Sequence, residues 1–329
     1  MLTPPDGLPG ETLPPMLERW WGVAAAAVKY LAVGWGSHHW EVTDTAGQRW
    51  FVTADELEHK RLSAREPLTA GFARLRAALT AARDLRDCGR EFVVAPVPAA
   101  DGEPVVRVAD GGFGLAVYPF IDGQRFEFEQ FSAPEDRLAV LGLLAAVHTA
   151  PAAARRHAVR DDYAVPRRDD LEAACAGRDA ADRGPYARPA AVLLKQHAAP
   201  VRRLLDRYDG LAGQARSGAA AVLTHGEPHP GNTMLTAGGW RLIDWDTALV
   251  APPERDLWSL DPGDGSILDA YASATGVRPQ PHLLDLYRLR WDLTDLALEV
   301  SRFRRPHAGS SDDEEGWALL RSLIEHISG

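Results

Sequence analysis

The sequence predicts an α+β protein in which a small β-rich lobe precedes a larger, mainly helical lobe. Three observations indicate this fold class. The first third of the chain holds roughly five short strand-like runs around one main helix. The remainder repeats its apolar residues mostly at helical spacing. The composition changes near residues 118–123, so we expect lobes at residues 1–118 and 119–329.

Five strands and three helices are expected in the first lobe. A short helix is predicted at residues 16–21, and a longer one at residues 69–87, where apolar residues recur at helical spacing. Asp55 and Glu58 have the spacing of a capping box, which predicts a further helix start. The predicted strands are residues 29–33, 38–43, 48–53, 104–108 and 113–118.

The second lobe is predicted to be helical with two short strands. Ser132 and Glu135 have capping-box spacing before an apolar-striped run that ends near residue 150. Residues 161–189 are rich in Arg, Asp and Ala, and we expect loops with one short helix there. The other predicted elements are helices at residues 190–208, 282–303 and 317–326, and strands at residues 222–223 and 241–243.

The composition is ordinary for a globular protein and acidic overall. The 329 residues are 46% hydrophobic and 25% charged, and the formal net charge is −10. Binders of nucleic acid or anionic membranes need basic surfaces, so we expect neither as a partner. The N-terminal residues lack the pattern of a secretory signal, and Cys88 and Cys175 lack metal-ligand spacing. We therefore expect a cytoplasmic protein, and the sequence does not predict its oligomeric state.

A polar loop and the strand after it carry the most informative motif. Residues 225–232 read His-Gly-Glu-Pro-His-Pro-Gly-Asn, and residues 242–246 read Leu-Ile-Asp-Trp-Asp. Phosphoryl transfer to an alcohol needs a carboxylate that accepts the proton, and oxygen ligands for Mg²⁺. Glu227, Asn232 and Asp244 have this chemistry, and the short strands would bring them to one end of a hairpin-like unit.

These motifs resemble those of the aminoglycoside phosphotransferases and the related choline kinase-like proteins. Residues 225–232 are similar to the family's H-G-D-x-H-x-x-N catalytic loop, and residues 242–246 to its L-I-D-W-D metal motif. Residues 253–257 resemble its P-x-x-D-L element, whose Asp is Asp256 here. The resemblance implies a bilobal protein-kinase-like fold, with Asp256 supporting the catalytic loop.

The same resemblance implies the roles of the remaining motif residues. Glu227 would be the catalytic carboxylate, and His225 belongs to the catalytic loop, where it is better suited to hold the loop than to react. Asn232, Asp244 and Asp246 would bind Mg²⁺, with ATP or GTP as the phosphate donor.

Two departures from the family pattern bear on activity. Glu227 stands where the family has Asp, and its side chain is one methylene longer. The phosphate-binding Lys of the third strand is expected within residues 50–54, where the chain has Thr53. Lys60 is the nearest lysine, and we expect it to bind the phosphates, with Arg49 as the alternative.

Two further segments are candidates for nucleotide binding. Gly34, Gly36 and Ser37 lie in a link between strands, and glycine lets the backbone approach phosphate closely. Tyr118 and Phe120 lie where the chain would pass between the lobes, and backbone groups there could bind a purine. Glycine-rich hairpins and plain strand ends also occur without a ligand, so both alternatives stay open.

Asp292, Asp295 and Glu299 fall on one face of the helix at residues 282–303. They form either a solvated acidic face or a wall that binds a cationic substrate.

The predicted function is transfer of the γ-phosphate of ATP or GTP to a hydroxyl of a small polar compound. An antibiotic of the aminoglycoside, aminocyclitol or nucleoside type is the expected acceptor, and a cellular alcohol such as choline or a sugar is the alternative. A binding-only pseudokinase is a second alternative. A metal-dependent hydrolase that uses His225, Glu227 and His229 is a third.

Overall fold

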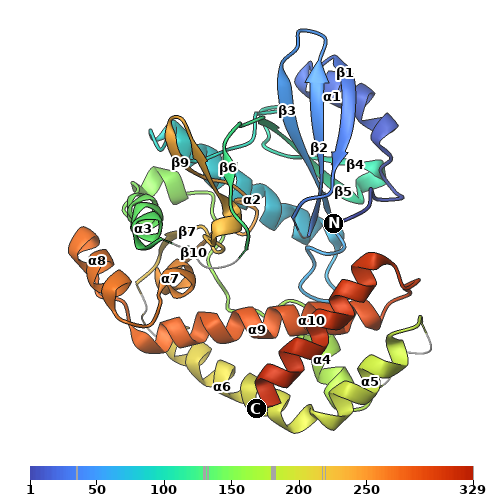
Figure 1. The fold of residues 1–329 in the computed structure, drawn as a ribbon, viewed down its shortest axis with the longest axis vertical. Coiled ribbons are helices and arrows are strands. Elements are labelled where there is room, and N and C mark those ends of the chain that lie inside the picture. Colours follow the sequence, from blue (N-terminus) through green and yellow to red (C-terminus); the bar gives the residue numbers. More distant parts are fainter. Residues whose placement is uncertain are drawn as a thin grey trace.

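The computed structural model describes residues 1–34, 36–128, 131, 133–178, 183–216, 218 and 220–328. Figure 1 shows a sheet-rich part formed by the N-terminal third and a helical part formed by the rest of the chain. In the described part of the chain, no helix combines the length and apolar character needed to cross a bilayer.

The N-terminal part contains one antiparallel sheet of five strands in the order β1-β2-β3-β5-β4. Alternate residues of the central strands are buried, among them Trp40 and Val42 of β2 and Val52 and Ala54 of β3. The elements are η1 (Gly10–Thr12), α1 (Leu13–Trp21), β1 (Ala25–Leu31), β2 (Ser37–Asp44), β3 (Arg49–Glu56), α2 (Leu68–Asp87), β4 (Val106–Val108), η2 (Ala109–Gly111) and β5 (Phe113–Pro119).

The C-terminal part is built around the long helix α9, which packs against α4, α6, α7 and α10. Its helices are α3 (Pro134–His148), η3 (Ala152–Arg155), α4 (Arg168–Cys175), α5 (Ala187–Gln196), α6 (Ala198–Arg216), η4 (Pro230–Asn232), α7 (Glu254–Leu260), α8 (Ser266–Thr275), α9 (Pro281–Phe303) and α10 (Ser311–Ser328). Its strands are β6 (Gln124–Arg125), β7 (Val222–Thr224), β8 (Thr233–Thr236), β9 (Gly239–Leu242) and β10 (Leu249–Ala251). β7 pairs with β10, and β6, β8 and β9 form a separate small sheet.

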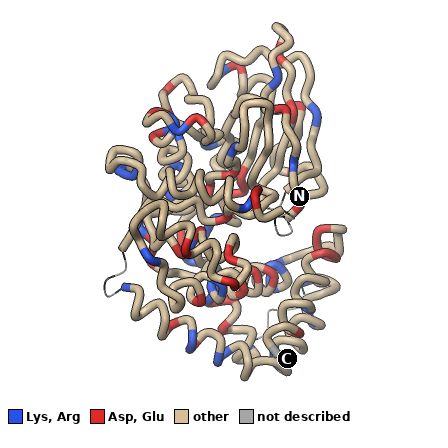
Figure 2. Tube along the Cα trace, turned by 60° about the vertical axis from the view of Figure 1, so that its left-hand side comes forward, with Lys and Arg blue, Asp and Glu red and all other residues tan. Residues whose placement is uncertain are grey.

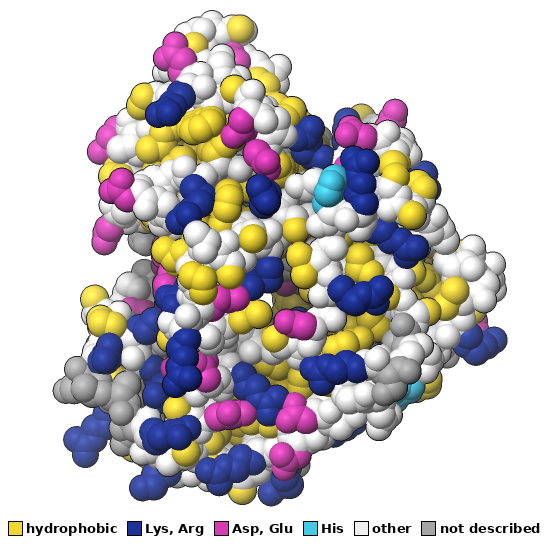
Figure 3. All heavy atoms as spheres, turned by 180° about the vertical axis from the view of Figure 1, so that it is seen from behind, with side chains coloured by type: hydrophobic (Ala, Val, Ile, Leu, Met, Phe, Trp, Pro, Cys, Tyr) yellow, Lys and Arg dark blue, Asp and Glu magenta, His cyan; other side chains and the backbone are white. Residues whose placement is uncertain are grey.

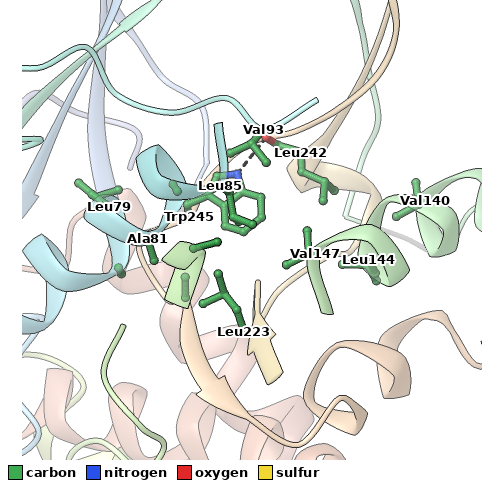
Figure 4. Close-up of a cluster of buried hydrophobic side chains, with 14 of the residues drawn as sticks. Leu79, Ala81, Leu85, Val93, Val140, Leu144, Val147, Leu223, Leu242 and Trp245 are labelled. Atoms are coloured by element: carbon green, nitrogen blue, oxygen red, sulfur yellow. Dashed lines mark hydrogen bonds between the residues drawn. The ribbon is translucent and has the colours of Figure 1, made fainter. Parts of the chain in front are cut away.

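One apolar cluster joins the two parts (Figure 4). Leu79, Ala81 and Leu85 of α2 meet Val147 of α3 around the buried ring of Trp245. The indole nitrogen of Trp245 donates a hydrogen bond to the carbonyl of Leu242, at 3.0 Å. Helix α2 therefore shares its buried cluster with Leu242 and Trp245 of the Leu-Ile-Asp-Trp-Asp motif. The expected lobe boundary at residues 118/119 stays a prediction.

The helix start predicted at Asp55 is wrong. Strand β3 continues through Asp55 and Glu56, which pair with Gly114 and Phe113 of β5. Residues 57–60 form turns, and the next helix begins only at Leu68. Pairing with β5 satisfies the backbone groups that a helix start would otherwise use, so the local capping signal is overridden.

Two helix boundaries also differ from the predictions. Helix α10 begins at Ser311 rather than at residue 317, because Asp313 accepts hydrogen bonds from the backbone N–H groups of Gly309 and Ser310. Helix α3 begins at Pro134 without a side-chain cap, and Ser132 lies outside the described residues. The predicted helix at residues 190–208 is divided into α5 and α6.

Candidate active site

Two loops that are distant in sequence meet at one end of the small C-terminal strands. The catalytic-type loop, residues 225–232, joins β7 to β8, and residues 243–248 join β9 to β10. Since β7 pairs with β10 and β8 with β9, both loops leave their strands at the same end. The backbone N–H of Ile243 donates to the carbonyl of Asn232 at 3.0 Å. The two motifs found in the sequence therefore form one unit.

The side chain of His225 connects the two loops by hydrogen bonds. Its ring is fully buried, and Nε2 donates to the carbonyl of Ile243 at 2.8 Å. Nδ1 accepts a longer hydrogen bond from the backbone N–H of Glu227, at 3.3 Å. Burial lowers the pKa of His225, so the ring stays neutral and keeps one donor and one acceptor. This geometry suits the role of holding the loop.

Asp256 supports the same loop from α7. Its carboxylate is fully buried and accepts hydrogen bonds from the backbone N–H groups of His225 at 2.8 Å and Gly226 at 2.6 Å. A third hydrogen bond comes from His148 Nε2 at 2.9 Å. Burial raises the pKa of Asp256, but the hydrogen bond and charge of His148 outweigh it and keep the pKa below its ordinary value. His148 lies 108 residues away in sequence, and no local pattern pointed to it.

Asp256→Asn is expected to destabilise the protein by about 2–4 kcal/mol, because an amide cannot accept all three hydrogen bonds and leaves a buried donor without a partner. The measurement is the free energy of unfolding in urea. Asp269→Asn is the matched control, since Asp269 forms only an exposed ion pair with Arg278 and should change stability by less than about 0.5 kcal/mol. Equal stability of the two variants would contradict the supporting role of Asp256.

Gly226 accommodates a close contact within this loop. It has a φ of +105°, and a Cβ at this position would overlap the guanidinium of Arg255. That guanidinium is buried and donates to Thr224 Oγ1 at 2.9 Å and to the carbonyl of Thr247 at 2.8 Å. Arg255 thus joins the end of β7 to residues 243–248, a contact that no local sequence pattern predicts.

Asp244 has an unusual backbone and an unusual carboxyl group. Its φ of +63° is in the left-handed region, which is costly for a residue other than glycine and is often retained at functional sites. Burial, followed by the charges of Asp246 and Glu227, raises its pKa well above the ordinary range. A bound cation would relieve this crowding of carboxylates.

The residues present fit a magnesium ion. Asn232 uses its amide nitrogen to donate to the carbonyl of Glu227 at 3.0 Å, so its oxygen can serve as a ligand beside Asp244 and Asp246. Mg²⁺ usually takes few protein ligands and completes its shell with water and phosphate oxygens. Among the residues that the structure describes, no three His, Cys, Asp or Glu side chains converge as a metal site. His225, Glu227 and His229 therefore do not form the cluster that a hydrolase would need.

Glu227 lies in the loop that joins β7 to β8. About a third of its side chain is exposed (34%), and Oε2 lies 4.0 Å from His229 Nε2. Burial, followed by the charge of Asp246, raises its pKa to about 7. Figure 2 shows acidic segments gathered where the sheet-rich part meets the helical part.

One member of the acidic row of α9, Asp295, lies within the electrostatic influence of this carboxylate. Burial and the nearby charge of Glu227 raise the pKa of Asp295 to about 7. Within the described residues, Asp292 and Asp295 have no hydrogen-bond or ion-pair partner, whereas Glu299 pairs with Arg302 at 2.8 Å. The carboxylate of Glu299 is buried against Gly316 of α10. The row is not a solvated face, and two of its three carboxylates are unpaired.

Aromatic rings adjoin these carboxylates. Phe128 stacks on Trp291 of α9 with ring centroids 5.9 Å apart, and it contacts the ring of His229 at 4.5 Å. Phe128 is 60% exposed, although large apolar side chains usually avoid water. No local sequence pattern singled out Phe128. An exposed phenylalanine stacked on a half-buried tryptophan could contact a small molecule beside the unpaired aspartates.

The other candidate residues lie on the N-terminal sheet or in the segments next to its strands. Gly34 and Gly36 have positive φ values of +69° and +84°, and Trp35 between them lies outside the described residues. Ser37 Oγ donates to Asp55 at 2.6 Å. Lys60 forms ion pairs with Asp55 at 2.8 Å and with Asp246.

Arg49 and Phe120 lie together at the other end of β3. The guanidinium of Arg49 lies 3.7 Å above the Phe120 ring and pairs with Glu41 and Asp122. The backbone N–H of Phe120 donates to the carbonyl of Arg49 at 3.2 Å, so this group is already used. The hydroxyl of Tyr118 instead bonds to Thr53 and lies within the field of Asp55, Asp244 and Asp246.

Three comparisons relate the chain to known proteins. Residues 27–287 match the sequence model described as the phosphotransferase enzyme family. The chain is 31% identical over 253 residues to protein StrN of Streptomyces griseus, covering 74% of this chain and 75% of that protein.

The solved structures show the same fold. The chain is similar to spectinomycin phosphotransferase APH(9)-Ia in complex with ADP and spectinomycin, with a TM-score of 0.70 and 16% identity over 97% of this chain and 98% of that chain. It is also similar to amicoumacin kinase hAmiN in complex with AMP-PNP, Ca²⁺ and Ami, with a TM-score of 0.60 and 16% identity over 98% and 93% of the two chains. The α+β, kinase-like fold predicted from the sequence is confirmed, and identities this low show the fold alone.

Proposed function

Because the chain belongs to the phosphotransferase enzyme family, whose members transfer phosphate to small molecules, we propose that it transfers the γ-phosphate of ATP or GTP to a hydroxyl of an amine-bearing compound. An antibiotic of the aminoglycoside or aminocyclitol type has both groups. The observation that carries this proposal is the unpaired, largely buried carboxylate of Asp295 in the field of Glu227. A hydroxyl bound at Glu227 and an ammonium bound at Asp295 would fix one orientation of the acceptor.

Each residue of the site has a defined task in this reaction. Glu227 accepts the hydroxyl proton while the acceptor oxygen bonds to the γ-phosphorus and the bond to the bridging β–γ oxygen breaks, releasing the nucleoside diphosphate. Asn232, Asp244 and Asp246 would hold Mg²⁺, which neutralises charge on the phosphates when bound. His225 and Asp256 keep the loop in place through the hydrogen bonds described above.

The stacked rings of Phe128 and Trp291 add a second requirement on the acceptor. Phe128 and Trp291 offer a flat apolar surface beside the carboxylates. The apolar face of a sugar or cyclitol ring can lie on such a surface while its amines reach the aspartates. The same pair suits the alternative acceptor choline, because aromatic faces attract quaternary ammonium groups.

The test is a panel of hydroxyl-bearing compounds incubated with ATP or GTP and Mg²⁺. The panel contains aminoglycosides, aminocyclitols, nucleoside antibiotics, choline and neutral sugars. We expect nucleoside diphosphate to form only with an amine-bearing acceptor, whose mass rises by one phosphate. Nucleotide binding without phosphorylation of any acceptor would identify a pseudokinase, and modification of neutral sugars alone would contradict the amine requirement.

Acceptor binding is expected to depend on pH through Asp295. Its pKa is about 7, so the carboxylate is charged above pH 7 and attracts an ammonium group, and this attraction is lost as the pH falls below 7. The KM of an amine-bearing acceptor should fall roughly tenfold between pH 6 and pH 8, equivalent to about 1.4 kcal/mol. The measurement is KM at several pH values with saturating nucleotide.

Asp295→Asn should remove this dependence and raise the KM at pH 8 by roughly tenfold. Asp285→Asn is the matched control, because Asp285 lies on the same helix but pairs with Arg207 and Arg288 near the surface. A pH-dependent KM that persists in Asp295→Asn would assign the effect to another group.

A further inference from the structure

Lys60 lies between carboxylates from both parts of the molecule. Its ammonium pairs with Asp55 of β3 at 2.8 Å and with Asp246 of the Leu-Ile-Asp-Trp-Asp motif. The chain has only three lysines, and the other two, Lys29 and Lys195, are exposed. The Lys60 side chain is 21% exposed, so part of its surface remains accessible to a ligand.

Asp55 connects this lysine to the glycine-rich link. The residue is buried, with 3% exposed, and it stands opposite Ser37 in the register of β2 and β3. Ser37 Oγ donates to the carboxylate at 2.6 Å. One carboxylate therefore binds both Lys60 and the last residue of the segment expected to cover the phosphates.

We propose that Asp55 and Lys60 form a reversed version of the ion pair that usually binds nucleotide phosphates in this fold, with Lys60 as the phosphate-binding cation. The resemblance predicts a lysine on the third strand and a carboxylate on the following helix. Here the strand supplies the carboxylate, and the segment after the strand supplies the lysine. This inference rests on the proposed kinase function and assigns its nucleotide-binding residues.

The backbone of Lys60 is held in place from two sides. Arg74 of α2 donates to the carbonyl of Lys60 at 2.7 Å, and Gly71 of α2 packs against the same peptide group. From the C-terminal part, Arg167 binds the carbonyl and the carboxylate of Glu58, and its own N–H donates to the carbonyl of Leu62 at 2.7 Å. Because this turn is fixed before a nucleotide binds, Lys60 can contact a phosphate with a smaller loss of conformational entropy.

Lys60 supplies the positive charge beside the carboxylates of the expected metal site. Burial lowers the pKa of Lys60, but Asp246 and Asp55 outweigh it and keep the ammonium charged. Asp246 also belongs to the expected metal ligands, so a nucleotide bound there would meet Lys60 directly. The alternative cation, Arg49, already pairs with Glu41 and Asp122 at the opposite end of β3.

The experiment measures nucleotide affinity without an acceptor. ADP and a non-hydrolysable ATP analogue are titrated by calorimetry into wild type and into Lys60→Ala, with Mg²⁺ and again with a chelator. We expect Lys60→Ala to weaken both affinities roughly 10- to 100-fold, as for loss of a charged hydrogen bond. Lys195→Ala is the matched control and should bind as wild type does.

A lysine placed on β3 instead of at position 60 tests whether nucleotide affinity depends on the positive charge or only on the ion pairs that Lys60 forms. The double variant Lys60→Ala/Thr53→Lys carries the lysine where the resemblance expects it, and it should recover affinity to within roughly threefold of wild type. Asp55→Asn should weaken binding less than Lys60→Ala, because the lysine remains but loses one partner. The melting temperature of each variant separates lost binding from lost fold, and Lys60→Met replaces Lys60→Ala if the latter is unfolded.

A folded Lys60 variant that binds nucleotide as wild type does would overturn the proposal, and so would equal weakening by Lys195→Ala. Either result leaves the proposed function intact if acceptor-dependent ADP formation is observed. Absence of that turnover in wild type would instead contradict the proposed function, whatever the affinity of Lys60→Ala.

Discussion

Asp244→Asn is expected to lower kcat by at least about a thousandfold at ordinary Mg²⁺ while the fold is kept. An anionic ligand close to the reacting phosphates contributes several kcal/mol of transition-state stabilisation, and about 4 kcal/mol corresponds to that factor. Asn is the most informative replacement, since it tolerates the left-handed backbone found at this position. The measurement is acceptor-dependent ADP formation across a range of Mg²⁺ concentrations.

The stability of this variant provides its control. Repulsion from Asp246 and Glu227 is removed in Asp244→Asn, so its melting temperature in a chelator should equal or exceed that of wild type. Asp244→Ala should lose activity equally but melt lower, because Ala adopts a positive φ at greater cost. Near-normal turnover of Asp244→Asn at ordinary Mg²⁺ would exclude Asp244 as a metal ligand.

Glu227→Gln is expected to lower kcat by about 10²–10⁴-fold and to change the acceptor KM by less than about threefold. The carboxylate acts mainly in the transition state, where it receives the proton, whereas the amide can still hydrogen-bond the ground-state hydroxyl. Steady-state kinetics with the acceptor found in the panel test this directly. A Gln variant that keeps most of the wild-type kcat would show that another group receives the proton.

Glu227→Asp restores the residue expected from the family motif and serves as the matched variant. The shorter side chain withdraws the carboxylate by roughly an ångström, and such a displacement costs about a hundredfold when the surrounding loop is fixed. Here the loop is fixed by Asp256, His225 and Arg255. We therefore expect Asp at this position to be less active than Glu and more active than Gln.

The sequence predicted the fold class and the assembly of the two motif loops, because both depend on short-range patterns. In an antiparallel hairpin the start of the first strand lies beside the end of the second, so Asn232, just before one strand, and Asp244, just after the next, could be brought together without coordinates. The acidic face of α9 was also predictable from helical spacing alone. The catalytic, metal and nucleotide roles assigned to these residues stay predictions until the variants are measured.

The sequence could not predict contacts that depend on tertiary packing. The capping-box spacing of Asp55 and Glu58 suggested a helix, and only the pairing of β3 with β5 shows that Asp55 belongs to the strand. Lys60 was expected near the phosphates from proximity in sequence, but its pairing with Asp55 and Asp246 was not visible. His148 and Phe128 lack any local signal, since their contacts come from distant segments.

The apolar cluster around Trp245 bears on the cooperativity of unfolding. Side chains of α2 share this cluster with α3, β7 and β9. At this cluster, therefore, the N-terminal and C-terminal parts of the chain do not have separate cores. Figure 3 shows basic, acidic and apolar side chains interspersed over the rear face of both halves. Heat or denaturant should therefore destroy the nucleotide side and the acceptor side in one cooperative event, without a half-folded form that still binds one of the two substrates.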